Sequence, residues 1–413
     1  MENKKFEKSN TLQENHKNSC IKKDNIVDST QLNSTQLNST QLNSTIDIDT
    51  SKRITSLRYI LMCLVVFIHN CYRDEVRQWI VGLDGNPAIF VENQLSVWLK
   101  LLISNGLARC AVPLFFLFAA FLQAKKDDKY LVLLRKRVKS LLIPYISWML
   151  IYAFFYGGLK LVVAKIAPQY LKLPDNNMLT WSFIDWFHKI LGYKPDGTGD
   201  FELPEFAVQF WFVRDLMILI ILSPIIKYLI KKIPITFFLL NLALYLIPVR
   251  IFFVQNQALF FYCMGLYWGY FNYPLFEKID NITWYESLIL FALSFAFTYT
   301  FGGGLKTTSY YIMVVFDCFI FIKLSKFIVA NETIFNFCSK LAGFSFFLFA
   351  IHAPVLNSYI SKIWIYFFPM KNTFFSLLQY FIPTAITIII GTSIGILLKK
   401  IFPHIFKALN GGR

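Results

Sequence analysis

The sequence predicts an all-α polytopic membrane protein with about ten transmembrane helices and both termini in the cytoplasm. Of the 413 residues, 56% are hydrophobic and only 16% are charged, whereas soluble domains carry about 25% charged residues. Long apolar stretches recur from Ile54 to Phe402, with the charges gathered between them. Only helices and closed barrels satisfy the backbone within lipid, and these stretches are too long for barrel strands.

Residues 1–50 differ in composition from the rest of the chain. They are polar, lack an aromatic residue after Phe6, and contain the repeat STQLNSTQLNSTQLNST between Ser29 and Thr45. Such a short polar unit buries no apolar surface, so we expect a disordered cytoplasmic tail. No apolar segment typical of a cleaved signal peptide lies near Met1, so the first membrane helix is expected to target the chain.

The remaining chain divides into apolar stretches of helical length. We expect an integral membrane domain over residues 51–405 and a short C-terminal tail over 406–413. The predicted spans lie near residues 54–71, 96–122, 141–163, 211–230, 235–253, 256–272, 284–301, 309–329, 341–361 and 376–402. Some of these stretches are interrupted by proline or glycine.

The distribution of basic residues predicts the orientation. Lysines and arginines cluster on one side of the predicted membrane, at Lys52 and Arg53, from Lys125 to Lys139, at Lys227, Lys231 and Lys232, at Lys323 and Lys326, and at Lys399 and Lys400. Basic loops stay in the cytoplasm, which places both termini there. The turn from Asn272 to Glu286 is the exception, because it belongs on the cytoplasmic side yet carries three acidic residues. Acidic residues count little in this rule.

Composition excludes several classes of function. The formal net charge of +16 comes from short blocks beside predicted membrane helices, so nucleic-acid binding is not expected. The seven cysteines form no C-x-x-C pair and mostly lie in apolar stretches, which favours small buried side chains. No histidine has Cys, Asp or Glu at ligand spacing, so we predict no metal site and no bound cofactor.

The largest predicted external loop runs from about Ala164 to Phe210. It combines Trp181, Trp186 and His188 with several carboxylates. Aromatic rings mixed with carboxylates suit a polar, ring-shaped ligand such as a sugar. The same rings also suit an aromatic belt at the membrane interface, and the sequence favours neither interpretation.

Ionisable residues within membrane spans are costly and usually functional. Arg58 and His69 share the first span and are eleven residues apart, so they lie within about 20° of one helix face and about 16 Å apart along the axis. The other spans contain Arg109, Arg214, Asp215, Asp317 and His352. His69 is suited to act as both base and acid near neutral pH. Alternatively, His69 packs at the outer interface and Arg58 extends to the cytoplasmic headgroups.

Five segments in order resemble the membrane-bound acyltransferase 3 family, which O-acylates sugars and other cell-surface polymers. They are RYILMCLVVFIH (Arg58 to His69), RCAVPLFFLFAAF (Arg109 to Phe121), RKRVKSLLIPYISW (Arg135 to Trp148), FWFVRDLMILIILSP (Phe210 to Pro224) and FSFFLFAIHAPVL (Phe344 to Leu356). The first has the family's signature of Arg, ten residues and His. The resemblance covers about residues 52–402.

The sequence departs from the family's motifs at two places. Ala119 and Ala120 stand where the family has Ser-Gly, and Thr55 stands where many members have Asp. These differences are typical of a divergent branch, a different acyl group or lost activity.

The resemblance implies an O-acyltransferase in a bacterial inner membrane. Acyl-CoA, by default acetyl-CoA, is the implied donor, and a hydroxyl of a cell-surface or lipid-linked polysaccharide is the implied acceptor. Membrane lipids surround the protein. Arg58, with Arg135 and Arg137, is expected to bind the CoA phosphates through charge-assisted hydrogen bonds.

The resemblance also assigns catalytic roles. His69 is expected to take the proton of the acceptor hydroxyl or to carry the acyl group itself. Arg109 is expected to stabilise the oxyanion of the tetrahedral intermediate. His352 and Asp317 are candidates for orienting His69.

Two other classes of protein remain open from the sequence. A transporter of a glycan or small solute also carries intramembrane charges, although the chain lacks the internal repeat typical of secondary transporters. A non-catalytic membrane sensor or scaffold is the second alternative. Consumption of acyl-CoA distinguishes the enzyme from both.

Overall fold

A computed structural model of the chain describes residues 46–70, 94–126, 128–166, 178, 180–192, 206–247, 254–300, 303–369 and 372–412. These residues form helices joined by turns and short connections, with no β-sheet among them. The predicted all-α class is therefore confirmed for this part of the chain. Nearly all of the predicted N-terminal tail lies outside the described residues.

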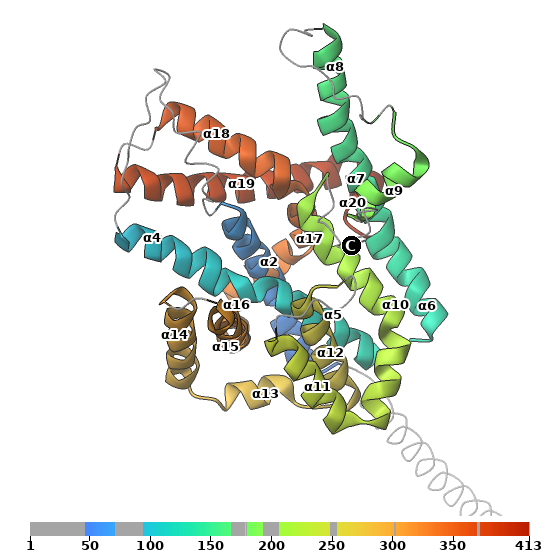
Figure 1. Cartoon of the computed structure of the whole chain (residues 1–413), viewed down its shortest axis with the longest axis vertical. Helices are drawn as coiled ribbons and strands as arrows, with labels where there is room; N and C mark the ends of the chain where they lie inside the picture. The colour runs from blue at the N-terminus through green and yellow to red at the C-terminus, as the bar shows by residue number, and fades with distance from the viewer. Residues whose placement is uncertain are drawn as a thin grey trace, which may run out of the picture.

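The helices follow one another closely along the chain (Figure 1). The α-helices are α2 (Ile48–His69), α4 (Gln94–Leu101), α5 (Ala111–Lys126), α6 (Tyr130–Arg137), α7 (Ile143–Ala153), α8 (Leu159–Ile166), α9 (Phe183–Leu191), α10 (Trp211–Lys232), α11 (Pro234–Leu246), α12 (Asn256–Tyr270), α13 (Leu275–Asp280), α14 (Trp284–Thr300), α15 (Gly303–Ala330), α16 (Glu332–Ala342), α17 (Ser345–Ile351), α18 (Asn357–Phe367), α19 (Thr373–Ile401) and α20 (Pro403–Leu409). The 3₁₀ turns are η2 (Leu107–Cys110) and η5 (Val208–Phe210). The π-helical turns are η1 (Leu102–Gly106), η3 (Val138–Leu142), η4 (Phe154–Gly158) and η6 (His352–Leu356).

Three helical stretches among the described residues are long and apolar enough to cross a membrane. They are Leu95–Lys126, Ser345–Phe367 and Thr373–Ile401. The first contains α4, η1, η2 and α5 in one run, and the second joins α17 to α18 through η6. The total of about ten spans and the cytoplasmic position of both termini stay predictions.

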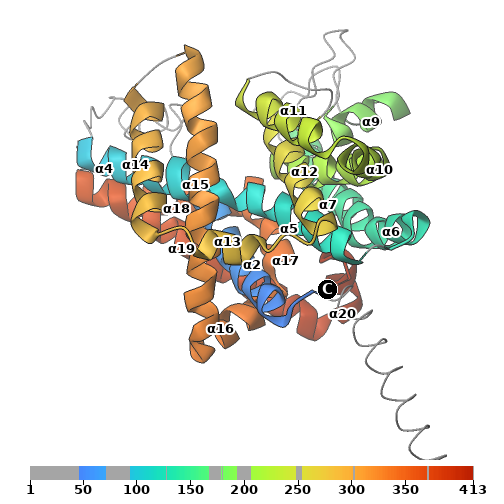
Figure 2. The ribbon, with the colours of Figure 1, turned by 90° about the horizontal axis from the view of Figure 1, so that it is seen from below.

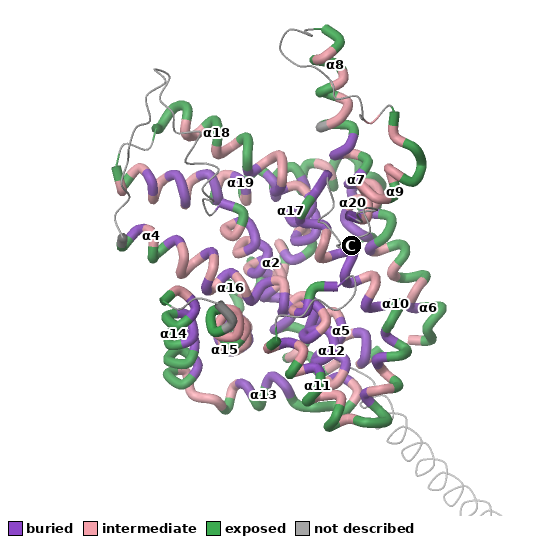
Figure 3. The backbone as a smooth tube through the Cα atoms, in the orientation of Figure 1, coloured by how far each residue is buried: buried purple, intermediate pink, exposed green. Residues whose placement is uncertain are grey.

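Helix α2 lies at the centre of the bundle. Asp47 caps its first turn by accepting a hydrogen bond from the Thr50 N–H at 3.1 Å. Helices α5, α15, α16, α17 and α19 all pack against it. Figure 3 shows buried residues concentrated on α2, α5 and α17, while α8 and α14 are largely exposed. The helix that carries Arg58 and His69 is thus a core element of the bundle.

Two groups of helices lie near the two ends of the α4–α5 stretch. In Figure 2, α14 and α15 are near its α4 end, and α10, α11 and α12 are near its α5 end. Helices α5 and α12 approach closely at Gly265, where an added Cβ would lie 2.3 Å from the Leu117 carbonyl oxygen and 2.8 Å from the Ala120 Cβ. A small residue at position 120 therefore fits the close packing of α5 against α12.

The predicted span 341–361 is not one straight helix. Helix α16 ends at Ala342, α17 begins at Ser345, and the backbone breaks again at Ala353, with φ −128° and ψ 156°. Pro354 explains the second break, because proline pushes the preceding residue out of helical geometry and cannot donate to the carbonyl four residues earlier, that of Ala350.

The turn from Asn272 to Glu286, which was the exception to the charge pattern, has one of its acidic residues, Asp280, paired with a buried arginine. Arg53 of α2 is only 2% exposed and donates two hydrogen bonds of 2.8 Å to the carboxylate of Asp280. Its Nε also donates to Ser325, and the guanidinium lies 4.7 Å from the centre of the Phe276 ring. Asp280 is therefore neutralised by a neighbouring basic segment.

Helix α9 is the longest described element of the predicted external loop. Trp181 and Trp186 pack edge to face at 5.2 Å, and both rings also contact Phe206. Phe183 and Phe187 of the same helix are exposed. The tryptophan rings are used in packing, and both interpretations of this loop stay predictions.

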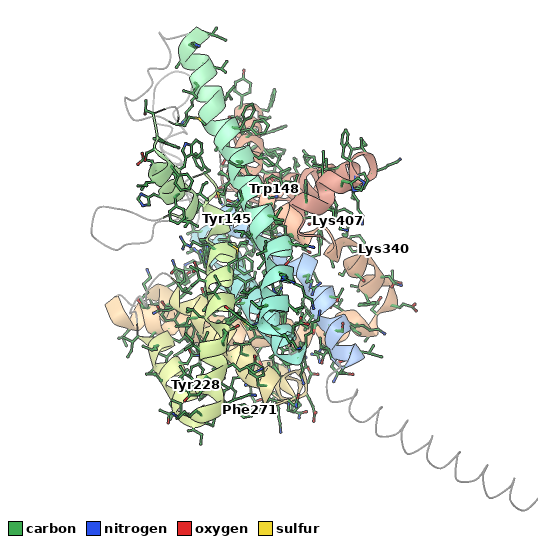
Figure 4. All side chains as sticks on the ribbon, turned by 90° about the vertical axis from the view of Figure 1, so that its right-hand side faces the viewer. Tyr145, Trp148, Tyr228, Phe271, Lys340 and Lys407 are labelled. Atoms are coloured by element: carbon green, nitrogen blue, oxygen red, sulfur yellow. The ribbon has the colours of Figure 1, made fainter. Side chains whose placement is uncertain are left out.

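The residues after α19 pack back onto the bundle. Phe406 of α20 is buried, and the Trp148 indole of α7 donates a 3.1 Å hydrogen bond to the Leu409 carbonyl. Figure 4 shows Trp148 along α7 and Lys407 on the neighbouring α20. The segment expected as a tail over 406–413 thus begins within a docked helix.

Candidate active site

A cavity of about 240 Å³ lies between α2, α5, α6, α10 and α17. Most of its wall is apolar, formed by Met62, Val65, Val112, Phe115, Phe118, Ala119, Leu122, Leu141, Phe212, Leu216, Phe346 and Phe349. The remaining lining residues are Arg58, Lys126, Arg137 and Ser345. No aspartate or glutamate lines the cavity in the described part of the chain.

Three cations gather at one end of this cavity. Arg58 comes from α2, Lys126 from the last turn of α5 and Arg137 from the last turn of α6. Neither Arg58 nor Lys126 forms an ion pair within the described residues. Burial lowers the pKa of Arg137, although the group stays charged at neutral pH because the ordinary value for arginine is so high. Three poorly compensated positive charges make this end a site for a polyanion.

The structure separates the two arginines that the sequence grouped together. Arg137 lines the cavity, whereas Arg135 is exposed and does not line it. Two residues correspond to about 200° around a helix, so the two side chains point to opposite faces of α6. Lys126 was not predicted, although its spacing of four and seven residues from Leu122 and Ala119 marks it as part of the same helix face.

The cavity wall continues toward the predicted catalytic residues. On α2 the lining residues are Arg58, Met62 and Val65, and the next position on that face is His69. On α17 the lining residues Phe346 and Phe349 are followed at the same spacing by His352. Neither histidine lines the cavity itself; each lies one helical step beyond the last lining residue of its helix.

Helix α5 runs antiparallel to α2, and its start lies toward the same end of α2 as His69. Its lining residues extend from Lys126 back to Val112, and Arg109 lies three residues before Val112. The turn η2 that holds Arg109 packs directly on α2. Ser104 of the adjoining η1 donates a 2.8 Å hydrogen bond to the Phe67 carbonyl, which fixes this turn beside the end of α2 that carries His69.

The two histidines lie side by side. Their ring centroids are 5.0 Å apart, with the planes inclined by 60°. His352 is fully buried, and its Nδ1 lies 2.8 Å from the Phe349 carbonyl oxygen and 3.2 Å from that of Leu348. Both neighbours of Nδ1 are acceptors, so this nitrogen carries the proton. In the neutral ring Nε2 is then an acceptor, and it is buried without a partner.

Two side chains that sequence reasoning missed hold the break next to His352. The Tyr152 hydroxyl donates to the carbonyls of Ala350 and Ala353 at 2.7 and 2.9 Å. The Gln209 amide donates to the same two oxygens. Pro354 leaves the Ala350 carbonyl without its helical donor, and these side chains replace that donor.

The end of α2 that carries His69 is held by α18 and α19. The Asn357 amide donates a 3.1 Å hydrogen bond to the His69 carbonyl. The Thr387 hydroxyl in turn donates a 3.2 Å hydrogen bond to the Asn357 side-chain oxygen. The next residue, Asn70, donates to the Tyr380 carbonyl and to the Thr384 hydroxyl at 2.9 and 2.6 Å. His69 itself is exposed at this end. The histidine therefore stands on a fixed backbone with an accessible ring.

Asp317 contacts the turn that holds Arg109, and its expected role in orienting His69 stays a prediction. Its Oδ2 accepts a 2.9 Å hydrogen bond from the Cys110 N–H. Two residues that differ from the family's motifs have defined surroundings. Ala119 lines the cavity, and the Thr55 hydroxyl donates a 2.8 Å hydrogen bond to the Ser51 carbonyl of its own helix.

Comparisons with known proteins agree with this arrangement. A succinoglycan biosynthesis protein, ExoH, of Rhizobium meliloti (strain 1021) is 26% identical over 228 residues, which are 54% of this chain and 54% of that protein. The chain thus aligns with about half the length of this curated relative. No solved structure matches the chain. The acyltransferase domain family matches residues 51–398. The chain belongs to the acyltransferase 3 family.

Proposed function

We propose that this protein is an integral membrane O-acyltransferase that moves an acyl group, most simply acetyl, from cytoplasmic acyl-CoA to a hydroxyl of a cell-surface or lipid-linked polysaccharide. We place it in the inner (plasma) membrane of a bacterium. The name of the relative, a succinoglycan biosynthesis protein, supports a polysaccharide acceptor. No resident cofactor takes part in the proposed reaction.

One arrangement supports the proposal: an apolar cavity is lined by three cations, and the faces of α2 and α17 that line it carry, one helical step beyond the lining residues, a pair of adjacent histidines. The phosphates of CoA match Arg58, Lys126 and Arg137, because charge-assisted hydrogen bonds to phosphate are strong. The uncharged pantetheine arm and the acyl group match the apolar wall. Along α2, Arg58 and His69 are about 16 Å apart.

In the proposed reaction the acceptor oxygen attacks the thioester carbonyl carbon while His69 takes its proton. The carbonyl oxygen becomes an oxyanion, which Arg109 stabilises. The carbon–sulfur bond then breaks, and the departing CoA thiolate receives the proton from His69. The products are an acylated hydroxyl and free CoA. His352, with its proton fixed on Nδ1, presents Nε2 as an acceptor that orients the neighbouring ring or the incoming hydroxyl.

The test is mass spectrometry of the surface glycans of three otherwise identical cell lines. They make the wild type, a His69→Ala variant at a matched membrane level, or neither. The proposal requires a mass increase of one acyl group per modified hydroxyl with the wild type alone, and the size of the increase identifies the acyl group. Equal glycans in all three lines, together with solute flux that consumes no acyl-CoA, would establish the transporter instead.

A further inference from the structure

A group of buried polar residues surrounds the turn that holds Arg109. Arg109 lies in η2, between the π-helical turn η1 and α5. One of its terminal nitrogens donates to the Asn105 side-chain oxygen, and its Nε is buried without a partner. The side chain is thus held by Asn105 and contacts Tyr310, while its Nε–H lacks an acceptor.

Asp317 of α15 lies on the other side of this turn. It is fully buried, and only one of its oxygens is used, since Oδ2 accepts from the Cys110 N–H at 2.9 Å while Oδ1 has no partner. No cation forms an ion pair with it in the described part of the chain. An isolated carboxylate in a membrane-embedded core is costly, so its retention needs an explanation.

The face of α15 that carries Asp317 is directed at the Arg109 turn. Tyr310 is seven residues before Asp317, which places the two on one face of the helix, and its phenol interacts electrostatically with both Arg109 and Asp317. The Cys318 thiol also reaches the Cys110 carbonyl, at 4.0 Å. Helix α15 therefore contacts both the backbone and the side chain of the turn.

We propose that Asp317 is a positioning residue for Arg109: its carboxyl group fixes the adjacent backbone through the Cys110 N–H, and with it the direction in which the guanidinium is presented to the histidine pair. This inference rests on the proposed function, in which Arg109 stabilises the oxyanion. Asp317 does not touch the substrate. Its effect reaches the reaction only through the direction in which Arg109 presents its N–H groups.

Two variants of Asp317 separate the effect of its charge from the effect of its hydrogen bond to Cys110. Asp317→Asn keeps an oxygen that accepts from the Cys110 N–H but removes the charge, whereas Asp317→Ala removes both. A misplacement of about 1 Å in a catalytic group costs about 10²-fold in rate, so we expect a loss of that order for Asp317→Ala and a smaller one for Asp317→Asn. The KM for acetyl-CoA stays within about threefold in both, because the cations that bind CoA are distant.

The control is Cys318→Ala, which removes the neighbouring contact to the same residue, Cys110, without changing a charge. We expect its maximal rate to stay within about threefold of the wild type, as for a weak hydrogen bond to sulfur. The assay combines purified full-length protein in lipid nanodiscs with radiolabelled acetyl-CoA. Membranes from cells that lack the protein supply the polysaccharide acceptor. The rate is the amount of radiolabel that becomes bound to polysaccharide per unit time.

A double-mutant cycle decides the inference. In an Arg109→Gln background, Asp317→Ala should cause no further loss of rate, because the group that it positions is absent. An equal loss in both backgrounds would overturn the proposal, and so would a rise in KM with the maximal rate unchanged. If the wild type transfers neither acetyl nor the acyl group identified by the glycan mass increase, the proposed function fails, and the coupling is then measured in the melting temperatures of the same four proteins. Additive shifts there would overturn the pairing.

Discussion

Substitution of Arg137 by glutamine tests the anion site at the end of the cavity. The change removes one of three cations there while keeping a side chain of similar length. A hydrogen bond to a charged group contributes about 1.5–3 kcal/mol, which corresponds to about a 10- to 150-fold rise in KM for acetyl-CoA. Arg58 and Lys126 remain and continue to attract the phosphates, so we expect the lower end of this range. The maximal rate should change little, because Arg137 is remote from the histidine pair.

The same substitution at Arg135 provides the contrast. Arg135 is exposed on the opposite face of α6, so Arg135→Gln should raise KM by less than about threefold. Lys136→Gln is the matched control, since Lys136 is exposed and paired with Asp128 at 2.7 Å. Initial rates of CoA release are measured over a range of acetyl-CoA concentrations at low salt and at 0.5 M salt, where screening is expected to reduce the effect of Arg137 (the Debye length falls to about 3 Å at 1 M).

Two results would refute the reasoning. Equal rises in KM for the Arg137 and Arg135 variants would mean that a general basic surface, rather than the cavity, attracts the donor. An unchanged KM for Arg137→Gln, with a reduced maximal rate, would mean that the cavity is not the donor site.

The remaining predictions concern the histidine pair and the packing around it. His352→Ala should lower acyl transfer by about 10²-fold at an unchanged membrane level, because it removes the acceptor that orients His69 or the incoming hydroxyl; a well-folded variant with a wild-type rate would exclude the role. Asn357→Ala should cost about 1–3 kcal/mol of stability, because it leaves the His69 carbonyl unpaired at the end of α2, and thermal unfolding in nanodiscs measures this loss. Arg53→Met should destabilise the protein by up to about 3–5 kcal/mol, because Asp280 loses both hydrogen bonds to the guanidinium and keeps the longer 3.8 Å ion pair to the exposed Lys326; a melting temperature equal to that of the wild type would contradict it.

Helical class followed directly from the sequence, but the breaks within helices did not. Apolar length predicts a helix wherever the backbone must satisfy itself in lipid. The span expected over 341–361 is divided because Pro354 removes one backbone donor, and Tyr152 and Gln209 supply others from distant parts of the chain. Local sequence reveals the missing donor, whereas its replacements depend on tertiary packing.

The sequence predicted which residues belong to the candidate site better than it predicted which of them contact one another. Helical periodicity aligned Arg58 with His69, and the structure brings His352 next to His69. Periodicity also implied that Arg135 and Arg137 face opposite ways, but not which of them faces the cavity. Asp317 was expected to orient His69, which stays a prediction, and its contact with the Arg109 turn was not foreseen, because the partner of a buried carboxylate is set by how α15 packs.

The separation between the cations of the cavity and the histidine pair has an energetic consequence. Moving one elementary charge across a membrane potential of 100 mV involves about 2.3 kcal/mol. In the proposed reaction the nucleotide and its phosphates stay at Arg58, Lys126 and Arg137, and only a neutral acyl group passes along the wall toward His69. The membrane potential then does no work on the charges of the donor during acyl transfer, however many charges the donor carries. The transfer rate should therefore not vary with membrane voltage.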